Sequence, residues 1–365
     1  MKKIGIMSMQ RIINYGSYLQ AFGLKKTIEE LGYDVEFIDY HYEKSVLKEK
    51  SKVFKFLNKI SNVIKTSNYV ESKKTYINFK KNIEVALKEI GVTNKYNYNH
   101  NIDALIIGSD EVFNCIQSYP VGYSRELFGK NYENIDVISY AASFGYTTIG
   151  SLKKYHIFSE VSNLLNNFKS ISVRDENSKY IAEKLTDKQI SEHLDPVLIS
   201  NYTSYIKKEC NLNDFIIIYA YNGRLTKSEE EYIKSFAKLH NKKIVSLGFY
   251  QRIADYNLTI HPLAVLDYFD NADFVITDTF HGTVFSIKMN TKFCTLIRNS
   301  NANKLNSLLE KLELADRSVK KISDIEKLYN IDINFKETNE ILKNERKRTI
   351  GYLEKNLKKD DLENE

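Results

Sequence analysis

Short apolar runs and longer amphipathic stretches alternate along the chain. The apolar runs, such as residues 3–8 and 104–107, end in polar or glycine-containing turns. Residues 18–31 instead carry an apolar stripe at helical spacing, formed by Leu19, Phe22, Ile28 and Leu31. Strands that alternate with helices in this way are typical of α/β proteins. The pattern therefore predicts an α/β fold.

The same alternation occurs in both halves of the chain. Further strands are expected at residues 35–38, 137–139, 171–173, 215–220, 243–247, 274–277 and 293–297. The chain has 365 residues, which exceeds one ordinary hydrophobic core, and Asp195–Pro196 separates the two sets. We therefore expect domains over residues 1–200 and 201–334. A charged C-terminal helix, 335–365, is expected to cross back to the first domain.

A lysine-rich helical insertion is expected within the first domain, at about residues 41–100. Its apolar residues at helical spacing are Val53, Phe54, Leu57, Ile60 and Ile64. Such a basic amphipathic helix packs on the domain with its lysines in water, or lies on an anionic membrane surface. The first arrangement is the commoner one, and the sequence leaves both open.

Composition narrows the class of protein. Hydrophobic residues make up 42% and charged residues 27%, and no run approaches the roughly 18–20 apolar residues of a membrane span. Polar residues from Gln10 onward interrupt the N-terminal run too early for a signal peptide. The three cysteines are far apart and show no metal-ligand spacing. We expect a cytoplasmic protein with reduced thiols and no metal, either free or peripheral at the inner membrane face.

The formal net charge of +6 favours anionic partners such as acidic small molecules, phosphates or an anionic membrane face. The lysines are scattered rather than interleaved with aromatic residues in a stripe, so no nucleic-acid partner is expected.

The stretch 272–290 carries the strongest chemical signal. An apolar strand ends in a polar turn, and His281–Gly282 then open a helical pattern. Ligands of open α/β sheets bind beyond the carboxyl ends of the strands, and a helix N-terminus offers N–H groups to an anion. A lone histidine more often has a structural role, but this position favours a functional one.

Other polar residues also follow predicted strands. Gly16 after the first strand lets the backbone approach a ligand, or forms a plain turn. Asp110 either caps a helix or binds a sugar hydroxyl. Arg174 either grips a carboxylate or phosphate, or forms a surface ion pair with Asp175 or Glu176.

Several segments together resemble the polysaccharide pyruvyl transferase family. They run in family order from residue 3 to about residue 317: IGIMSMQRIINYGSYLQAFGLKKTIEELGYDVEFIDY, IDALIIGSDEVFN, ISYAASFG, ISVRDENS, LDPVLI, ADFVITDTFHGTVFSIKMN and LNSLLEKLELADR. The resemblance implies two Rossmann-like domains in a GT-B-like arrangement, with the active site in the interdomain cleft. It implies transfer of pyruvate from phosphoenolpyruvate, without a cofactor, to form a ketal on a sugar. The acceptor would be a cell-surface glycan or its lipid-linked precursor.

The resemblance also assigns roles to residues. The histidine of the TDxxHG segment is His281 and the strand-end arginine is Arg174, and both types contact the donor in relatives. His281 is therefore expected to anchor the donor and transfer a proton, and Asp110 or Asp278 to accept one from the attacking hydroxyl. The other donor-binding candidates are Thr279, Gly282 and Lys304. The substrate-binding candidates are Asn14, Tyr15, Gly16, Gln20, Ser109, Ser143, Phe144, Tyr221 and Asn222.

Three segments depart from the family pattern. Thr279 lies where many relatives carry an arginine, and the GSDQVWN segment reads GSDEVFN here, with Glu111 and Phe113. Lys304 stands where relatives often have arginine, which keeps the charge but loses the bidentate fork.

Two other functions fit the same architecture. One is a GT-B glycosyltransferase with a nucleotide-sugar donor, whose diphosphate a helix N-terminus would bind equally well. The other is a glycan-binding member of the family without catalytic activity.

Overall fold

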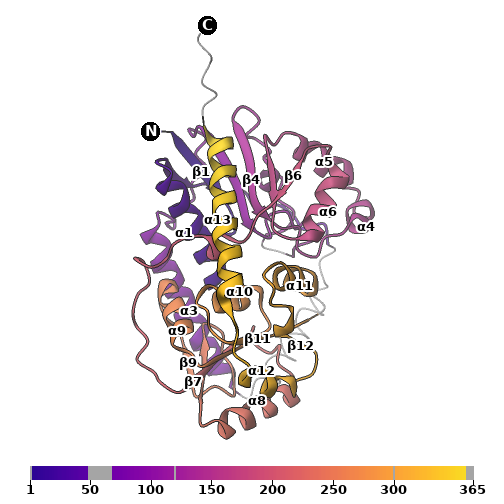
Figure 1. The fold of residues 1–365 in the computed structure, drawn as a ribbon. Coiled ribbons are helices and arrows are strands. Elements are labelled where there is room, and N and C mark those ends of the chain that lie inside the picture. The colour runs from indigo at the N-terminus through magenta and orange to yellow at the C-terminus, as the bar shows by residue number, and fades with distance from the viewer. Residues whose placement is uncertain (1, 48–67, 119–120, 299–300, 359–365) are drawn as a thin grey trace.

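The computed structural model describes residues 2–47, 68–118, 121–298 and 301–358, which form two parallel sheets, each with six strands (Figure 1). The first sheet has the order β2 (Asp34–Phe37), β1 (Lys3–Met7), β3 (Ala104–Asp110), β4 (Asp136–Ala142), β5 (Ile171–Val173) and β6 (Ile190–Glu192). The second has the order β12 (Ser318–Val319), β11 (Phe293–Leu296), β10 (Phe274–Thr277), β7 (Phe215–Tyr219), β8 (Lys243–Leu247) and β9 (Tyr256–Leu258). The predicted α/β fold with two Rossmann-like domains is confirmed.

Helices connect the strands and cover the sheets. In the first domain they are α1 (Tyr15–Glu30), α3 (Tyr69–Glu89), α4 (Ile149–Lys154), α5 (Phe158–Asn166), α6 (Glu176–Leu185) and α7 (Pro196–Ile199). Beyond residue 200 they are α8 (Lys227–Leu239), α9 (Val265–Asn271), α10 (Phe280–Lys288), α11 (Ala302–Lys311), α12 (Asp324–Asn330) and α13 (Phe335–Leu357). Single 3-10 turns lie at Arg125–Phe128, Pro262–Ala264 and Ala315–Arg317.

Each sheet has one point where the direction of its strand order reverses. In the first sheet the reversal lies between β1 and β3, and in the second between β7 and β10. Connections on the two sides of such a point leave toward opposite faces of the sheet, which opens a crevice at the carboxyl ends of the strands. The loops after these four strands are therefore the places where each sheet can bind a ligand.

Apolar packing joins the two domains. Strand interiors such as β1 and β7 are fully buried because helices cover both faces of a parallel sheet. The short helix α7 packs against α1 of the first domain and α10 of the second, and all three belong to one continuous apolar cluster. This contact holds the carboxyl edges of the two sheets toward each other.

The helix α13 crosses from the second domain to the first sheet, as Figure 1 shows in yellow. The Tyr352 hydroxyl donates to the Ser139 carbonyl in β4 at 2.8 Å. Lys2 beside β1 donates to the Leu357 carbonyl at the end of the helix, at 2.7 Å. The expected boundary at residue 200 falls in the segment between α7 and β7 and stays a prediction.

The first helix begins earlier than the sequence pattern indicated. The apolar stripe indicated a helix over residues 18–31, but α1 begins at Tyr15. The Asn14 side chain accepts a hydrogen bond from the Gly16 N–H at 2.7 Å and caps the helix, which the apolar stripe does not reveal. Gly32 follows the helix end with φ +86°, a backbone conformation that favours glycine.

Part of the lysine-rich insertion is described. The helix α3 lies within it, whereas the amphipathic stretch expected around residues 53–64 lies outside the described residues. Of the helices that the structure describes, none has both the length and the apolar character needed to cross a membrane.

Candidate functional site

A pocket of about 340 Å³ lies between the carboxyl edges of the two sheets. We call it the interdomain pocket. The first domain lines it with Met9, Ile12, Asn14, Ser17, Asp110, Glu111, Gln117, Tyr146 and Arg174, and the second with Tyr221, Arg224, Thr279, Phe280, His281, Asn301 and Lys304. These residues lie at the carboxyl end of a strand or in the loop and first helical turn that come after it, and the two points of strand-order reversal both open into the pocket. Four predicted residues of different segments, Asn14, Asp110, Arg174 and His281, are thereby brought together.

The helix α10 positions His281. Its cap is Thr279, whose hydroxyl accepts from the Gly282 N–H at 2.9 Å. Gly282 allows the first turn to pack on β10, because a Cβ there would lie 2.1 Å from the Thr277 hydroxyl oxygen. The first N–H groups of a helix have no partner within it. The start of α10 therefore brings an imidazole and a positive dipole end to the pocket wall.

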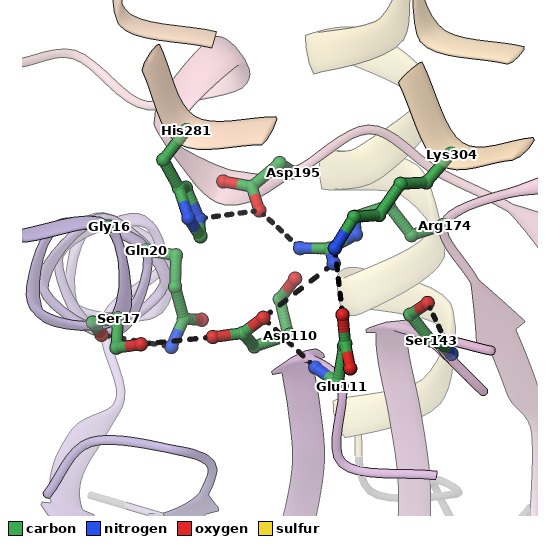
Figure 2. Close-up of polar contacts among 12 residues, drawn as sticks. Gly16, Ser17, Gln20, Asp110, Glu111, Ser143, Arg174, Asp195, His281 and Lys304 are labelled. Atoms are coloured by element: carbon green, nitrogen blue, oxygen red, sulfur yellow. Dashed lines mark hydrogen bonds and ion pairs between the residues drawn. The ribbon is translucent and has the colours of Figure 1, made fainter. Parts of the chain in front are cut away.

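Asp195 joins His281 to Arg174, as Figure 2 shows. Its Oδ2 accepts from Arg174 Nη1 at 2.8 Å and lies 3.6 Å from His281 Nε2, which is an electrostatic contact longer than a hydrogen bond. Its Oδ1 accepts from the Val197 N–H at 3.0 Å, which caps α7. Burial favours the neutral acid, but the interactions with His281 and Arg174 outweigh it and lower the pKa of Asp195. A buried carboxylate therefore fixes two side chains of the pocket at once.

Arg174 is buried instead of forming the surface ion pair that the sequence left open. Its side chain is 2% exposed, and Nη2 lies 3.6 Å from Asp110 Oδ1. Its guanidinium stacks over the Phe280 ring at 4.2 Å from the ring centre. In the described part of the chain, Arg174 Nε and His281 Nε2 are among the buried polar atoms without a hydrogen-bond partner. Such atoms are rare in folded proteins, and a functional role is one physical explanation for them.

The first turn of α1 forms the opposite wall. A Cβ at Gly16 would lie 2.1 Å from the imidazole Cγ and Nδ1 of His281, so only glycine allows this approach. The Ser17 hydroxyl donates to Asp110 Oδ2 at 3.1 Å, and Asp110 has an unusual positive φ of 78°. Asn14 donates to the Tyr221 hydroxyl at 3.2 Å across the domains. Gly16 therefore has a packing role that its position in a turn did not reveal.

Lys304 and Glu111 form a second contact across the pocket. The ammonium of Lys304 in α11 lies 2.7 Å from Glu111 Oε1, which follows β3. The other carboxylate oxygen of Glu111 accepts from Asn114 at 2.8 Å. Burial raises the pKa of Glu111, but the charge and hydrogen bond of Lys304, together with Asn114 and Arg174, outweigh burial and lower the pKa overall. Two of the three departures from the family pattern are therefore in direct contact.

Several predicted substrate-binding residues lie behind the pocket wall. Their side chains point into the interior, because neighbouring residues of a strand end or helical turn face different sides. The hydroxyl groups of Tyr15 and Ser109 donate to the backbone carbonyls of Ile260 and Ala141, and that of Ser143 donates to the Asp175 carboxylate. The Gln20 amide donates to the Ser8 hydroxyl and the Ser17 carbonyl. Phe144 belongs to an apolar cluster of the first domain. Asn222 lies on the surface, where it donates to Ser72. Of the predicted substrate-binding side chains, those of Asn14 and Tyr221 line the pocket, and the buried ones pack behind its wall.

Asp278 also lies behind the wall. Its carboxylate is fully buried and lies 3.4 Å from Arg298 Nε and 3.6 Å from Arg224 Nε. Burial raises the pKa of Asp278, and the two arginines oppose this only in part. The Asn301 side-chain amide donates to the backbone carbonyl of Asp278 at 2.6 Å. Of the two carboxylates expected to accept a proton, Asp110 is the one that lines the pocket.

The sequence reasoning missed Asp195, Arg224 and Asn301. Asp195 precedes a proline and was interpreted as a domain boundary, although an Asp–Pro pair is also a signal for a helix start. Arg224 follows β7 and satisfies the same strand-end rule that identified Arg174. Among the described residues, no group of three or more His, Cys, Asp or Glu side chains is placed to hold a metal ion.

Solved structures with the same fold include sugar-nucleotide enzymes. The UDP-GlcNAc 2-epimerase of Methanocaldococcus jannaschii, in complex with UDP-GlcNAc and UDP, has a TM-score of 0.50 and 14% identity, over 96% of this chain and 100% of that chain. The S. aureus MnaA structure with UDP has a TM-score of 0.50 and 11% identity, over 90% of each chain. At these identities the similarity shows the fold alone, which is the expected GT-B-like arrangement.

Sequence comparison identifies the family. No curated protein sequence matches the chain. The family described as polysaccharide pyruvyl transferase matches residues 14–301, a span that includes Asn14, Asp110, Arg174, Asp195 and His281. Because this match covers most of its length, the chain belongs to the polysaccharide pyruvyl transferase family.

Proposed function

We propose that the interdomain pocket transfers pyruvate from phosphoenolpyruvate to two hydroxyl groups of a sugar, forming a cyclic ketal on a polysaccharide or its lipid-linked precursor. Membership of the family supports the reaction class. The observation that carries the proposal is that His281, Arg174 and Lys304, which come from three separate segments, all line one pocket.

The charges of the pocket suit this donor. Phosphoenolpyruvate carries a carboxylate and a phosphate, and the pocket is lined by Arg174, Arg224 and Lys304. A guanidinium binds either anion through two parallel N–H bonds, while an ammonium acts as a point charge. The N-terminus of α10 adds N–H groups beside His281. These groups would hold both ends of the donor next to the imidazole.

The proposed reaction starts with protonation of the donor. The imidazolium of His281 gives a proton to the methylene carbon, which becomes a methyl group, and C2 becomes an oxocarbenium-like centre. A sugar hydroxyl attacks C2 and loses its proton, and the C2–O bond to phosphate breaks, so that phosphate leaves with the bonding electron pair. A second hydroxyl then attacks C2, loses its proton and closes the ring. One hydroxyl proton restores His281 and the other leaves with phosphate.

Asp110 is our choice for the base that accepts a proton from the attacking hydroxyl and passes it to the departing phosphate. It lines the pocket, and the Ser17 hydroxyl and Arg174 hold its carboxylate in place. Asp195 holds His281 and Arg174 from behind. Proton transfer by a positioned side chain typically contributes 10²–10⁴-fold to the rate.

The test is incubation of the purified protein with phosphoenolpyruvate and a panel of lipid-linked or synthetic glycans. We expect one acceptor to gain a pyruvyl ketal, detected by mass spectrometry, with release of one phosphate per ketal. Thermal-shift titration should show stabilisation by phosphoenolpyruvate, because binding to the native state raises the melting temperature. Stabilisation by nucleotide-sugars alone, with glycosyl transfer and no pyruvyl product, would overturn the proposal.

A further inference from the structure

The Glu111–Lys304 ion pair joins the two domains inside the interdomain pocket (Figure 2). Glu111 follows β3 of the first domain and Lys304 lies in α11 of the second, and both line the pocket. The two side chains are 23% and 20% exposed. The pair is therefore close enough to the ligand site for a ligand to reach either partner.

Lys304 lies among the cations that suit an anionic donor. Its ammonium is 5.8 Å from the centre of the Phe280 ring, and the Arg174 guanidinium is 4.2 Å from the centre of the same ring. His281 follows Phe280 directly in α10. An anion bound to Arg174 and His281 would therefore lie within reach of Lys304.

Glu111 carries a full negative charge in this cation cluster. The charge of Lys304 lowers the pKa of Glu111 in spite of burial, so the carboxylate is ionised at neutral pH. Asn114 holds its second oxygen at 2.8 Å. A ligand with several negative charges meets repulsion from Glu111 and competes with it for the ammonium.

We propose that Glu111 is an internal counter-ion, which occupies Lys304 until an anionic group of the donor replaces it. The inference rests on the proposed function for the identity of that anion, a phosphate or carboxylate of phosphoenolpyruvate. Glu111 thereby sets the affinity for the donor and favours ligands with enough charge to displace it.

The chain offers a matched control on the same helix. Lys311, also in α11, pairs with Glu192 of β6 at 3.2 Å, and these side chains are 23% and 19% exposed. This pair also joins the two domains, but neither residue lines the pocket. Lys311 keeps a second carboxylate, Glu345, at 3.6 Å when Glu192 is replaced. The control separates loss of a cross-domain contact from loss of charge in the pocket.

The experiment measures binding of phosphoenolpyruvate and of inorganic phosphate by calorimetry to the wild type, Glu111→Gln and Glu192→Gln. We expect Glu111→Gln to bind phosphoenolpyruvate about tenfold more tightly, equivalent to about 1.4 kcal/mol. Glu192→Gln should stay within about twofold of the wild type, since its charge is outside the pocket. Circular dichroism melting confirms that each variant is folded.

A second variant tests the partner. Lys304→Met should weaken binding, and the double variant with Glu111→Gln should lose most of the tenfold gain, because the gain depends on the freed ammonium. Equal or weaker binding by Glu111→Gln, or a gain that persists without Lys304, overturns the counter-ion. Absence of pyruvyl product and of phosphoenolpyruvate binding in the wild type overturns the proposed function instead. In that case the titration with inorganic phosphate decides: tighter binding by Glu111→Gln than by the wild type supports the counter-ion role, and equal or weaker binding contradicts it.

Discussion

The two domains bring different charges to the pocket that they share. The first contributes the carboxylates of Asp110 and Glu111 together with Arg174, and the second contributes His281, Arg224 and Lys304. The lining of the first domain therefore has an excess of negative charge, and that of the second has an excess of positive charge. The contacts Glu111–Lys304 and Asp195–His281 both pair a carboxylate of the first domain with a basic group of the second.

Neither domain alone therefore forms a complete site. The sheet edges of both domains follow the same rule for binding ligands, yet one edge supplies mainly carboxylates and the other mainly cations. An anionic donor would bind chiefly to the second domain and Arg174, and the hydroxyl groups of an acceptor to the acidic first domain. Variants on either side should therefore affect different steps.

Replacement of His281 by alanine should have the largest effect, because the imidazole is the proposed proton donor. We expect turnover to fall by about 10²–10⁴-fold, measured as phosphate release. His240→Ala is the control, since His240 pairs with Glu326 away from the pocket and its loss should leave turnover near the wild-type rate. Near-normal turnover in a folded His281→Ala protein would remove this residue from catalysis.

The two candidate bases differ in their access to the pocket. Asp110→Asn should lower kcat by about 10²-fold, since the amide cannot accept the hydroxyl proton. Asp278→Asn should lower kcat by less than about fivefold, because Asp278 acts only through its arginine neighbours. Steady-state kinetics with saturating donor tests both, and the reverse order of effects would make Asp278 the base.

Gly16→Ala probes the contact between the domains at the imidazole. The new methyl group would lie 2.1 Å from the His281 ring, so we expect displacement of the ring and a loss of about 10-fold or more in turnover. Gly351→Ala, in a helix where nothing lies within 4 Å of the added Cβ, should leave turnover unchanged and stabilise the fold by up to about 1 kcal/mol. Equal effects of the two variants would contradict the packing argument.

Asp195→Asn should lower stability in a pH-dependent manner. The native pKa of Asp195 is below its ordinary value of 3.8, so in acid the unfolded state binds more protons than the native state. Its contribution, about 1–3 kcal/mol, is full above about pH 4 and is lost as the pH falls through the native pKa.

Urea denaturation at pH 7 and pH 3 measures this effect. The gap between wild type and Asp195→Asn should narrow at the lower pH. Asp332→Asn, at a carboxylate that is 93% exposed, should change stability by less than about 0.5 kcal/mol at either pH. A gap of constant size would show that Asp195 acts through shape rather than charge.

Local pattern predicted much of the fold because the central strands of both sheets, such as β5, β7 and β10, are short, fully buried apolar runs. The expected strands at 171–173, 243–247 and 274–277 coincide with β5, β8 and β10. The start of α1 was wrong because a side-chain cap, and not the apolar stripe, sets it. Periodicity reports which face of an element is buried, and it says little about where capping begins.

The site was predictable only in part. Residues at strand ends reach the sheet edge whatever the tertiary structure, and this rule found Asp110, Arg174 and His281. It did not separate Asp110 from Asp278, because burial of a turn carboxylate depends on what packs over it. The role of Asp195 was not predicted, because it depends on contacts with Arg174 and His281, which are 21 and 86 positions away in the sequence. No local pattern indicates that these residues come together.

The α/β class, the approximate positions of the central strands and the family to which the chain belongs could all be inferred from the sequence alone. These follow from local composition and order, which require no knowledge of distant contacts. The pairing of Glu111 with Lys304, the packing of Gly16 on His281 and the contacts of Asp195 with His281 and Arg174 are set by the tertiary structure. Such contacts depend on how two sheets face each other, and that arrangement is fixed by packing around α7 and α13 rather than by any single segment.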